Sequence, residues 1–217
     1  MTSIDVTDVT ASLARHLPLY RRRTPRYQAV MLQSLRSLWQ GRPKRLLDIG
    51  GGTGVIAQCI SELFPVAAVV TVDVVDRFCP GLAIEARTFD GETLPFGDGA
   101  CDAATLNNVV HHVPLAVRAR LFSEIARVVD GPLYIKDHEA RSWLDHRRLA
   151  ALDVLGNVPF GGMVRADYLT LRDWQALADA AGYRIVETLH GSYRSGAMEL
   201  AFPNRLEITM RWEKRSA

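Results

Sequence analysis

A glycine-rich turn between an apolar run and a helical pattern constrains this chain more than any other feature. Residues 45–49 are typical of a buried parallel strand, and residues 54–64 have the apolar spacing of a helix. Four glycines follow the strand within five positions: Gly50, Gly51, Gly52 and Gly54. Glycines at such a turn let the backbone approach a ligand that a side chain would keep away. The sequence therefore predicts a nucleotide-type binding turn.

The order of the apolar patterns predicts an α/β fold. The expected strands are 45–49, 66–72, 84–89, 102–107, 133–136, 183–189 and 204–212, and the expected helices are 6–17, 25–40, 54–64, 114–129, 139–155 and 171–181. Strands that alternate with helices indicate a Rossmann-like, mostly parallel sheet with helices on both faces. The last two strands follow each other without a helix, which predicts an antiparallel C-terminal strand. Only about a dozen residues separate Asp73 from the third strand, so we expect a reduced helix after strand two.

The length of 217 residues suits one α/β domain with a complete core. We therefore expect a single domain over residues 1–217. Within it, residues 1–44 would form a helical cap, 45–136 a cofactor-binding half and 137–217 an acceptor-side half.

The composition is that of an ordinary globular protein, and no apolar run approaches the length of a membrane span. The N-terminal residues lack the apolar core of a secretory signal. Cys59, Cys79 and Cys101 are odd in number and show no close pairing, which favours neither a disulfide framework nor a zinc site. We expect a cytoplasmic protein without a membrane partner.

The glycine turn fits two nucleotide fingerprints. Residues 52–57 match G-x-G-x-x-A, the dinucleotide pattern, and Asp73 lies at a suitable distance for a ribose hydroxyl. Residues 48–54 equally match D-x-G-x-G-x-G, a pattern of methyl-donor binding. The fingerprint alone does not separate the two. A short-chain reductase would need Tyr-x-x-x-Lys, and none of the six tyrosines has a lysine four positions on.

The neighbouring motifs decide between the readings. Asp48 precedes the glycines, Asp73 ends the second strand, and residues 90–96 form an Asp-containing turn before Leu-Pro-Phe. The fourth strand, 101–105, continues to Val-His-His-Val-Pro at 110–114. With these motifs the chain resembles the class I S-adenosylmethionine (SAM)-dependent methyltransferases, in particular their small-molecule, methyltransferase type 11-like branch. The resemblance covers roughly residues 45–190.

The resemblance implies SAM as the cofactor and a set of contacts to it: Asp48, Gly50, Gly51, Gly52, Gly54, Asp73, Val74, Asp90, Gly91 and Asn107. Asp73 would accept hydrogen bonds from the ribose hydroxyls, and Asp48 would hold the ammonium group directly or through water. Asp90, with the Gly91 backbone, would meet the adenine, and Asn107 would face the methionyl end. Each of Asp73, Asp90 and Asn107 also fits an ordinary turn at a strand end.

Methyl transfer is an in-line displacement, so a dry site that aligns both reactants supplies much of the acceleration. A hydroxyl acceptor also needs a base, and histidine suits that task near neutral pH. His138 and His112 follow strands at the expected ligand-binding edge and are the candidate catalytic residues, although a structural role fits either of them. The sequence Asp137-His138-Glu139 invites a metal, but successive residues rarely face one ion and no third ligand set is evident, so no metal is expected.

The acceptor pocket should come from parts outside the core sheet. Helix 139–155, the segment 160–163 and the N-terminal helices would cover it, with these aromatic and sulfur-containing side chains as candidate lining: Tyr20, Tyr27, Trp143, Phe160, Met163 and Tyr168. We expect an apolar, medium-sized small molecule, O-methylated in preference to N- or C-methylated. An RNA or protein methyltransferase and a non-catalytic SAM-binding regulator are the alternatives.

Positive charge gathers near the N-terminus. Residues 1–45 carry nine Lys/Arg against two Asp, a charge of +7, while the whole chain is +2, so the remainder is −5. Arg21, Arg22, Arg23 and Arg26 would meet a carboxylate or phosphate of the acceptor, or a carrier protein that presents it. The alternative is a solvated basic face. No nucleic-acid-binding module accompanies the charge, so nucleic acid is not the expected partner. The oligomeric state stays open.

Overall fold

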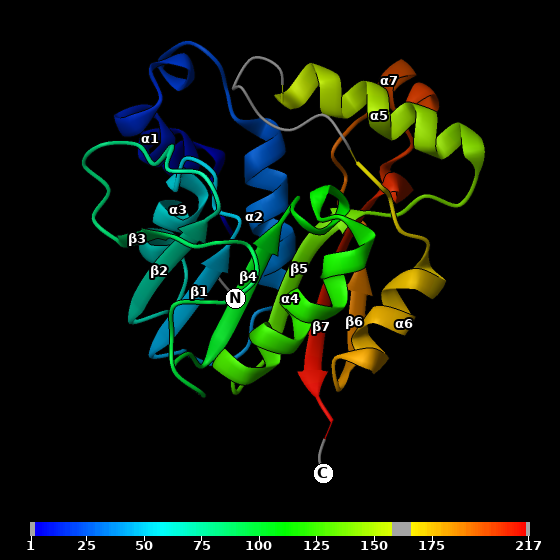
Figure 1. The fold of residues 1–217 in the computed structure, drawn as a ribbon. Coiled ribbons are helices and arrows are strands. Elements are labelled where there is room, and N and C mark those ends of the chain that lie inside the picture. The colour runs from blue at the N-terminus through cyan, green and yellow to red at the C-terminus, as the bar shows by residue number, and fades with distance from the viewer. Residues whose placement is uncertain (1–2, 158–165, 216–217) are drawn as a thin grey trace.

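The computed structural model describes residues 3–157 and 166–215. Its centre is a seven-stranded sheet in the order β3-β2-β1-β4-β5-β7-β6 (Figure 1). The strands are β1 (Arg45–Ile49), β2 (Ala68–Asp73), β3 (Glu85–Thr88), β4 (Ala103–Asn107), β5 (Leu133–His138), β6 (Tyr183–Leu189) and β7 (Glu207–Lys214). Among the described strands, β7 runs in the direction opposite to the other six and pairs antiparallel with both β5 and β6. The expected Rossmann-like sheet with an antiparallel C-terminal strand is confirmed.

Helices cover both faces of this sheet. The long helices are α1 (Val6–His16), α2 (Arg26–Leu38), α3 (Val55–Leu63), α4 (Leu115–Val128), α5 (Trp143–Asn157) and α6 (Leu171–Ala180). Successive residues of β1 point to opposite faces, as the pleat requires: Leu46 packs in the cluster under α1, α2 and α3, and Leu47 in the cluster under α4. Helix α5 crosses above the carboxyl ends of the strands (Figure 1).

The connection between β2 and β3 is short, as expected. Residues 74–84, all of them described, contain turns and bends but no helix. The third strand lies at the sheet edge and is largely exposed. The two residues that follow β2, Val74 and Val75, are exposed.

Three local expectations differ from the structure. Strand β5 extends to His138, because Asp137 and His138 pair with Ile208 and Glu207 of β7. Helix α5 consequently begins at Trp143 and not at residue 139. Residues 204–206 form a 3-10 turn, η4 (Asn204–Leu206), and a short helix, α7 (Ala197–Ala201), precedes it where only a loop was expected.

Two sequence features have simple structural counterparts. Thr170 and Asp173 form a reciprocal capping box at the start of α6, as Thr170 suggested. Cys59, Cys79 and Cys101 are free thiols. No helix in the described ranges is long and apolar enough to cross a membrane.

Candidate cofactor and active site

The glycine turn joins β1 to α3 at the carboxyl edge of the sheet. A Cβ on Gly51 would lie 1.8 Å from Thr71 Oγ1, and a Cβ on Gly50 would lie 2.6 Å from Val109 Cγ2. Gly52 differs: its φ is +59°, and the nearest described atom to its Cβ position is Arg77 Nη2, at 3.8 Å. The first two glycines therefore allow tight packing, while Gly52 faces open space. Gly54, with φ +78°, caps α3.

Asp48 lies beneath this turn and is buried. Its carboxylate accepts hydrogen bonds from Thr71 Oγ1 (2.9 Å), Thr105 Oγ1 (2.8 Å) and Asn107 Nδ2 (3.2 Å). Burial raises the pKa of Asp48, and these three hydrogen bonds oppose the rise. The structure does not bring Asp48 to the surface of the turn, so it acts as a support for Asn107 and the neighbouring strands.

Asp73 joins the end of β2 to the glycine turn. Its Oδ2 accepts a hydrogen bond from the Gly52 amide at 2.7 Å, and its Oδ1 accepts one from Val75 at 3.0 Å. Arg77 Nη2 lies 3.8 Å from Oδ2. A carboxylate is thus fixed beside the one open position of the turn.

Val74 and Gly91 lie against each other beyond Asp73. Val74 is 51% exposed, and a Cβ on Gly91 would lie 3.2 Å from its Cγ1. Asp90 is exposed, and its Oδ1 accepts hydrogen bonds from the amides of Glu92 (2.8 Å) and Thr93 (2.7 Å). These backbone hydrogen bonds lower the pKa of Asp90. Oδ1 of Asp90 therefore stabilises the turn, which is the alternative role that the sequence left open, and only Oδ2 is available to a ligand.

Asn107 ends β4 next to Asp48. Its Nδ2 donates to Asp48, while its Oδ1 is buried and has no hydrogen-bond partner among the described residues. Buried polar oxygens are nearly always paired in native proteins, so this atom indicates a donor that a ligand would supply.

Histidines gather where β4 and β5 end. His111, in the 3-10 turn η2 (Val110–His112), is 1% exposed, and its Nδ1 pairs with Asp137. Asp137 also accepts hydrogen bonds from the amides of Val110 (2.9 Å) and His138 (2.8 Å). Burial acts to raise the pKa of Asp137, but the charge and hydrogen bond of His111 outweigh it and hold that pKa well below its usual range.

The two predicted catalytic histidines flank His111. The His138 ring lies 4.9 Å from the His111 ring, and its Nδ1 is 3.2 Å from Glu207 Oε2. The half-buried His112 ring lies 4.0 Å from that of His111. Tyr168 stacks on His111 at 5.4 Å. Both candidates are thus at the predicted edge, and both contact His111, which follows the same strand as His112 but was not selected as a catalytic residue.

A buried lysine links α2 to this edge through Tyr27. Lys136 Nζ lies 2.6 Å from Glu207 Oε2, 2.7 Å from Asn108 Oδ1 and 2.5 Å from the Tyr27 hydroxyl. Arg194 also pairs with Glu207. The sequence did not predict this network, because the partners of Lys136 come from elements that are distant in the chain.

The candidate acceptor-lining residues divide. Tyr27 contacts the buried Lys136, and Tyr168 contacts the buried Asp153. In contrast, the Tyr20 hydroxyl accepts a hydrogen bond from Gln28 at 2.8 Å, and Trp143 is 72% exposed. Phe160 and Met163 lie outside the described residues. Arg21, Arg22 and Arg23, between α1 and α2, and Arg26, the first residue of α2, are exposed.

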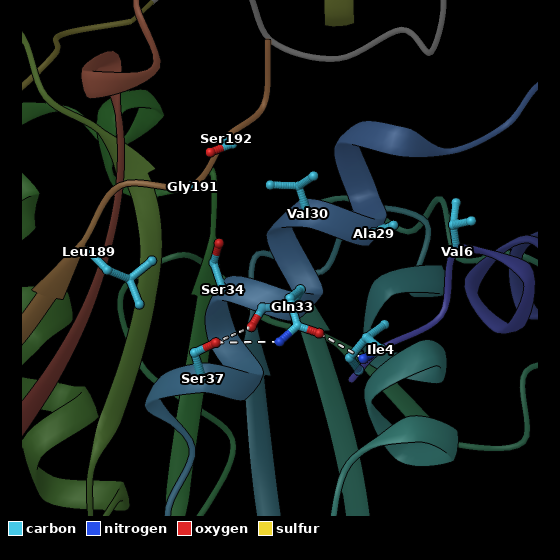
Figure 2. A pocket seen from close by; sticks show the side chains of 10 residues that line it. All are labelled: Ile4, Val6, Ala29, Val30, Gln33, Ser34, Ser37, Leu189, Gly191 and Ser192. Atoms are coloured by element: carbon cyan, nitrogen blue, oxygen red, sulfur yellow. Dashed lines mark hydrogen bonds between the residues drawn. The ribbon is translucent and has the colours of Figure 1, made fainter. Parts of the chain in front are cut away.

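A separate groove of about 400 Å³ lies between the N-terminal segment, α2 and residues 189–192 (Figure 2). Gln33 spans its floor, accepting a hydrogen bond from the Ile4 amide at 2.7 Å. None of the predicted site residues lines this groove, so it is distinct from the glycine-turn site.

Comparison with known proteins places this geometry in a family. A family model described as a methyltransferase domain matches residues 20–188. A malonyl-[acyl-carrier protein] O-methyltransferase of Geobacter sulfurreducens is 30% identical over 159 residues, which cover 67% of this chain and 57% of that protein. The chain thus spans little more than half the length of this curated relative.

Solved structures share the fold. The YcgJ protein of Bacillus subtilis matches with a TM-score of 0.63 at 20% identity, over 85% of this chain and 99% of that one. The magnesium protoporphyrin IX methyltransferase of Synechocystis PCC 6803, solved with bound S-adenosylhomocysteine (SAH), matches with a TM-score of 0.54 at 18% identity, over 78% and 74%. The chain belongs to the class I SAM-dependent methyltransferases, and SAM is its cofactor.

Proposed function

We propose that Gly52, Asp73 and Asn107 hold SAM along the carboxyl edge of β1, β2 and β4. Gly52 offers an open backbone position, and the fixed carboxylate of Asp73 suits the two ribose hydroxyls. The unpaired Oδ1 of Asn107 would accept a hydrogen bond from the ammonium group. Asp48 contributes by orienting Asn107, and not by direct contact. The exposed pair Val74 and Gly91, with the second oxygen of Asp90, would border the adenine.

SAM supplies an electrophilic methyl group, and the acceptor must attack it in line. The chain's part is to align the acceptor and to exclude water from the reacting atoms. The observation that carries the proposal is the pair of buried imidazoles, His111 and His138, at the same sheet edge as Asn107. Such groups suit an acceptor that gives up a proton, which favours transfer to an oxygen atom of a small molecule. His138 or His112 would take that proton.

The entrance to the acceptor side carries positive charge. Arg21, Arg22, Arg23 and Arg26 are exposed beside the N-terminal cap, which Tyr27 joins to the site. The Geobacter relative is named for an acceptor on a carrier protein. An anionic or carrier-bound acceptor is therefore the substrate class we propose for this chain.

Transfer of labelled methyl groups tests the proposal. The protein would be incubated with methyl-labelled SAM and three acceptor groups: malonyl-carrier protein, free carboxylic acids and phenols. We expect label in an oxygen-bound methyl, released by mild alkali from an ester and retained in an ether. Label found only on nitrogen or carbon, in RNA or in protein side chains would contradict O-methylation of a small molecule. No transfer despite tight SAM binding would favour the regulatory alternative.

Variants assign the roles within that assay. His138→Ala and His112→Ala should lower turnover of a hydroxyl acceptor while leaving SAM affinity unchanged, and unchanged rates in both would remove these histidines from the reaction. Replacing Arg21, Arg22 and Arg23 together with Gln should raise the KM for an anionic acceptor but not for a neutral one. If the triple variant changes the KM of the anionic and the neutral acceptor equally, these arginines have no role in binding the acceptor and are only solvated surface residues.

A further inference from the structure

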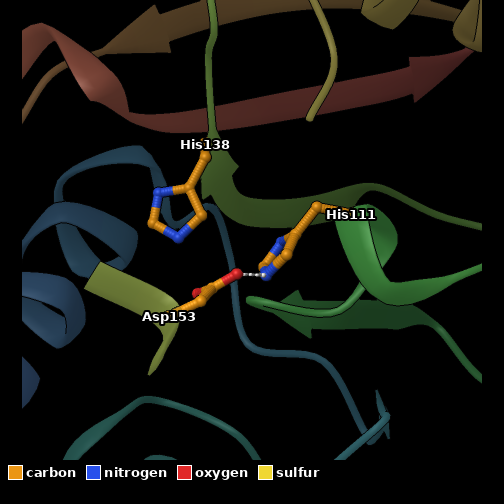
Figure 3. Close-up of side chains that lie close together, drawn as sticks. All are labelled: His111, His138 and Asp153. Atoms are coloured by element: carbon orange, nitrogen blue, oxygen red, sulfur yellow. Dashed lines mark ion pairs between the residues drawn. The ribbon is translucent and has the colours of Figure 1, made fainter. Parts of the chain in front are cut away.

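His111, His138 and Asp153 converge although they come from three separate elements. One is in η2, one ends β5 and the third lies on α5. Each offers one ligand atom, and these atoms lie within 4.8 Å of one another (Figure 3). His111 Nε2 lies 3.5 Å from Asp153 Oδ2. This is the third-ligand arrangement that the segment 137–139 alone did not offer.

A carboxylate lies behind each histidine: it forms a hydrogen bond with His111, and it approaches His138 without one. Nδ1 of His111 pairs with Asp137, and Nδ1 of His138 lies 3.2 Å from Glu207 Oε2. The second ring nitrogen of each therefore remains for the space that faces Asp153. Metal-binding histidines nearly always have such a carboxylate or carbonyl on their other nitrogen, because it fixes the tautomer and the orientation of the ring.

The third side chain is fixed as well. The Tyr168 hydroxyl donates to Asp153 Oδ2 at 2.5 Å, and Asp153 is 7% exposed. His111 Nε2 is buried and forms no hydrogen bond within the described part of the chain. An unpaired imidazole nitrogen that is buried and directed at a carboxylate needs a partner between them.

The local charge favours a cation. Three buried carboxylates, Asp137, Asp153 and Glu207, stand against two cations, Lys136 and Arg194. With both imidazoles neutral, one negative charge is in excess. A protonated His111 would balance it, and a divalent ion on the neutral rings would more than balance it.

We propose that His111, His138 and Asp153 bind one divalent transition-metal ion of the zinc class. Two imidazoles and one carboxylate select Zn²⁺, Fe²⁺, Co²⁺ or Mn²⁺ over Mg²⁺ and Ca²⁺, which prefer oxygen ligands. Ligands about 2.1 Å from a tetrahedral zinc stand about 3.4 Å apart, so the 3.5 Å pair already fits. The distances from the His138 ligand atom to the other two ligand atoms are at most 4.8 Å, so they must shorten by at most about 1.4 Å.

Three protein ligands leave a coordination position open, as catalytic metal sites require. Because the cluster lies at the acceptor edge, that position would take an oxygen atom of the acceptor and make its hydroxyl more acidic. His138 would then be a ligand and not the base. This role rests on the proposed function, whereas metal binding itself does not.

Metal binding can be measured without cofactor or acceptor. Purified full-length protein, stripped with a chelator, would be titrated with Co²⁺ by visible absorption and calorimetry, and its Zn²⁺ content after gel filtration measured by mass spectrometry. We expect one ion per chain. Asp153→Asn should weaken binding at least about 100-fold. Asp145→Asn, a buried aspartate of the same helix that pairs with Arg205 instead, should bind metal like the wild type.

Two results would overturn the inference. One is stripped wild-type protein that takes up no stoichiometric Co²⁺ or Zn²⁺. The other is an Asp153→Asn variant, shown by circular dichroism to be folded, that binds as tightly as the wild type. Calorimetry of the metal-free protein with SAM separates either failure from a failure of the proposed methyl transfer.

Discussion

Replacement of Gly52 by alanine should weaken cofactor binding far more than it weakens the fold. The φ of Gly52 is +59°, a left-handed conformation that costs an L-residue about 1–2 kcal/mol. The added Cβ would meet no described protein atom closer than Arg77 Nη2 at 3.8 Å, so strain is the main cost to folding. In a chain of this length, that cost lowers Tm by about 2–8 °C.

The effect on the cofactor follows from the same open space. The methyl group would occupy the side of the turn on which we place SAM, and the cofactor would have to move away from the backbone. We expect SAH affinity to fall by at least about 1.4 kcal/mol, which is tenfold in Kd. Calorimetry with SAH and thermal melts of the same sample measure both quantities.

Gly41 supplies the matched control. Its φ is +63°, and no described atom lies within 4 Å of its Cβ position. It lies between α2 and β1, at the opposite end of the strand from the site. Gly41→Ala should therefore lower Tm to a similar extent and leave SAH affinity unchanged. Wild-type affinity in Gly52→Ala, or equal losses of affinity in both variants, would refute this reasoning.

The remaining predictions concern four other side chains. Asp73→Ala should weaken SAM binding at least about tenfold in calorimetry, and NADH should not bind to the wild type; binding of NADH in place of SAM would contradict the assignment. Asn107→Ala should also lower SAM affinity about tenfold, and it should cost about 1.5–3 kcal/mol in urea unfolding because the buried Asp48 carboxylate loses the hydrogen bond from Asn107 Nδ2. Lys136→Met should cost about 3–5 kcal/mol in urea unfolding, since Glu207 loses one of its two buried cations; Lys136→Met combined with Glu207→Gln should recover part of it, and no recovery would exclude the ion pair as the cause. The Asp145→Asn variant should lose about 2 kcal/mol at pH 7, because hydrogen bonds from an arginine lower the pKa of Asp145 to about 2, below an unfolded value of about 3.9. Between pH about 4 and about 2, Asp145 is protonated in the unfolded chain but not in the folded one. The difference in unfolding free energy between the variant and the wild type should therefore vanish as the pH falls through this range, and a constant difference would exclude the linkage.

The order of elements was predictable because it depends on local patterns. Strands β1, β2 and β4 are short apolar runs bounded by turn residues, and α6 begins at a capping threonine and ends before Gly182. The absence of a helix after β2 followed from chain length alone. These features need no information about distant parts of the chain.

Site residues were predictable from the sequence only where they belong to one continuous motif. The glycine turn and Asp73 are contiguous with their strands, so sequence placed them correctly at the edge. His138 was expected after a strand that in fact includes it, since pairing with Glu207 of β7 extends β5. Asp48 carries the family motif but is buried under the turn, a fact that depends on Thr71 and Thr105 from two other strands.

The polar networks could not be predicted because their members are far apart in sequence. Asp153 lies on a helix without a motif and meets His111 only after α5 crosses the strand ends. Lys136 and Tyr27 are 109 positions apart and gave no joint signal. The expectation of no metal considered the segment 137–139, whereas the ligands that we propose come from three separate elements of the fold.

We have proposed that Gly52, Asp73 and Asn107 bind the methyl donor. A crystal structure of the protein with SAH tests it most directly. We expect the ribose hydroxyls on the Asp73 carboxylate, the ammonium group on Asn107 Oδ1 and the methionyl part of SAH against Gly52. Electron density for SAH anywhere else, or a site at Gly52 that stays empty at saturating SAH, would contradict it.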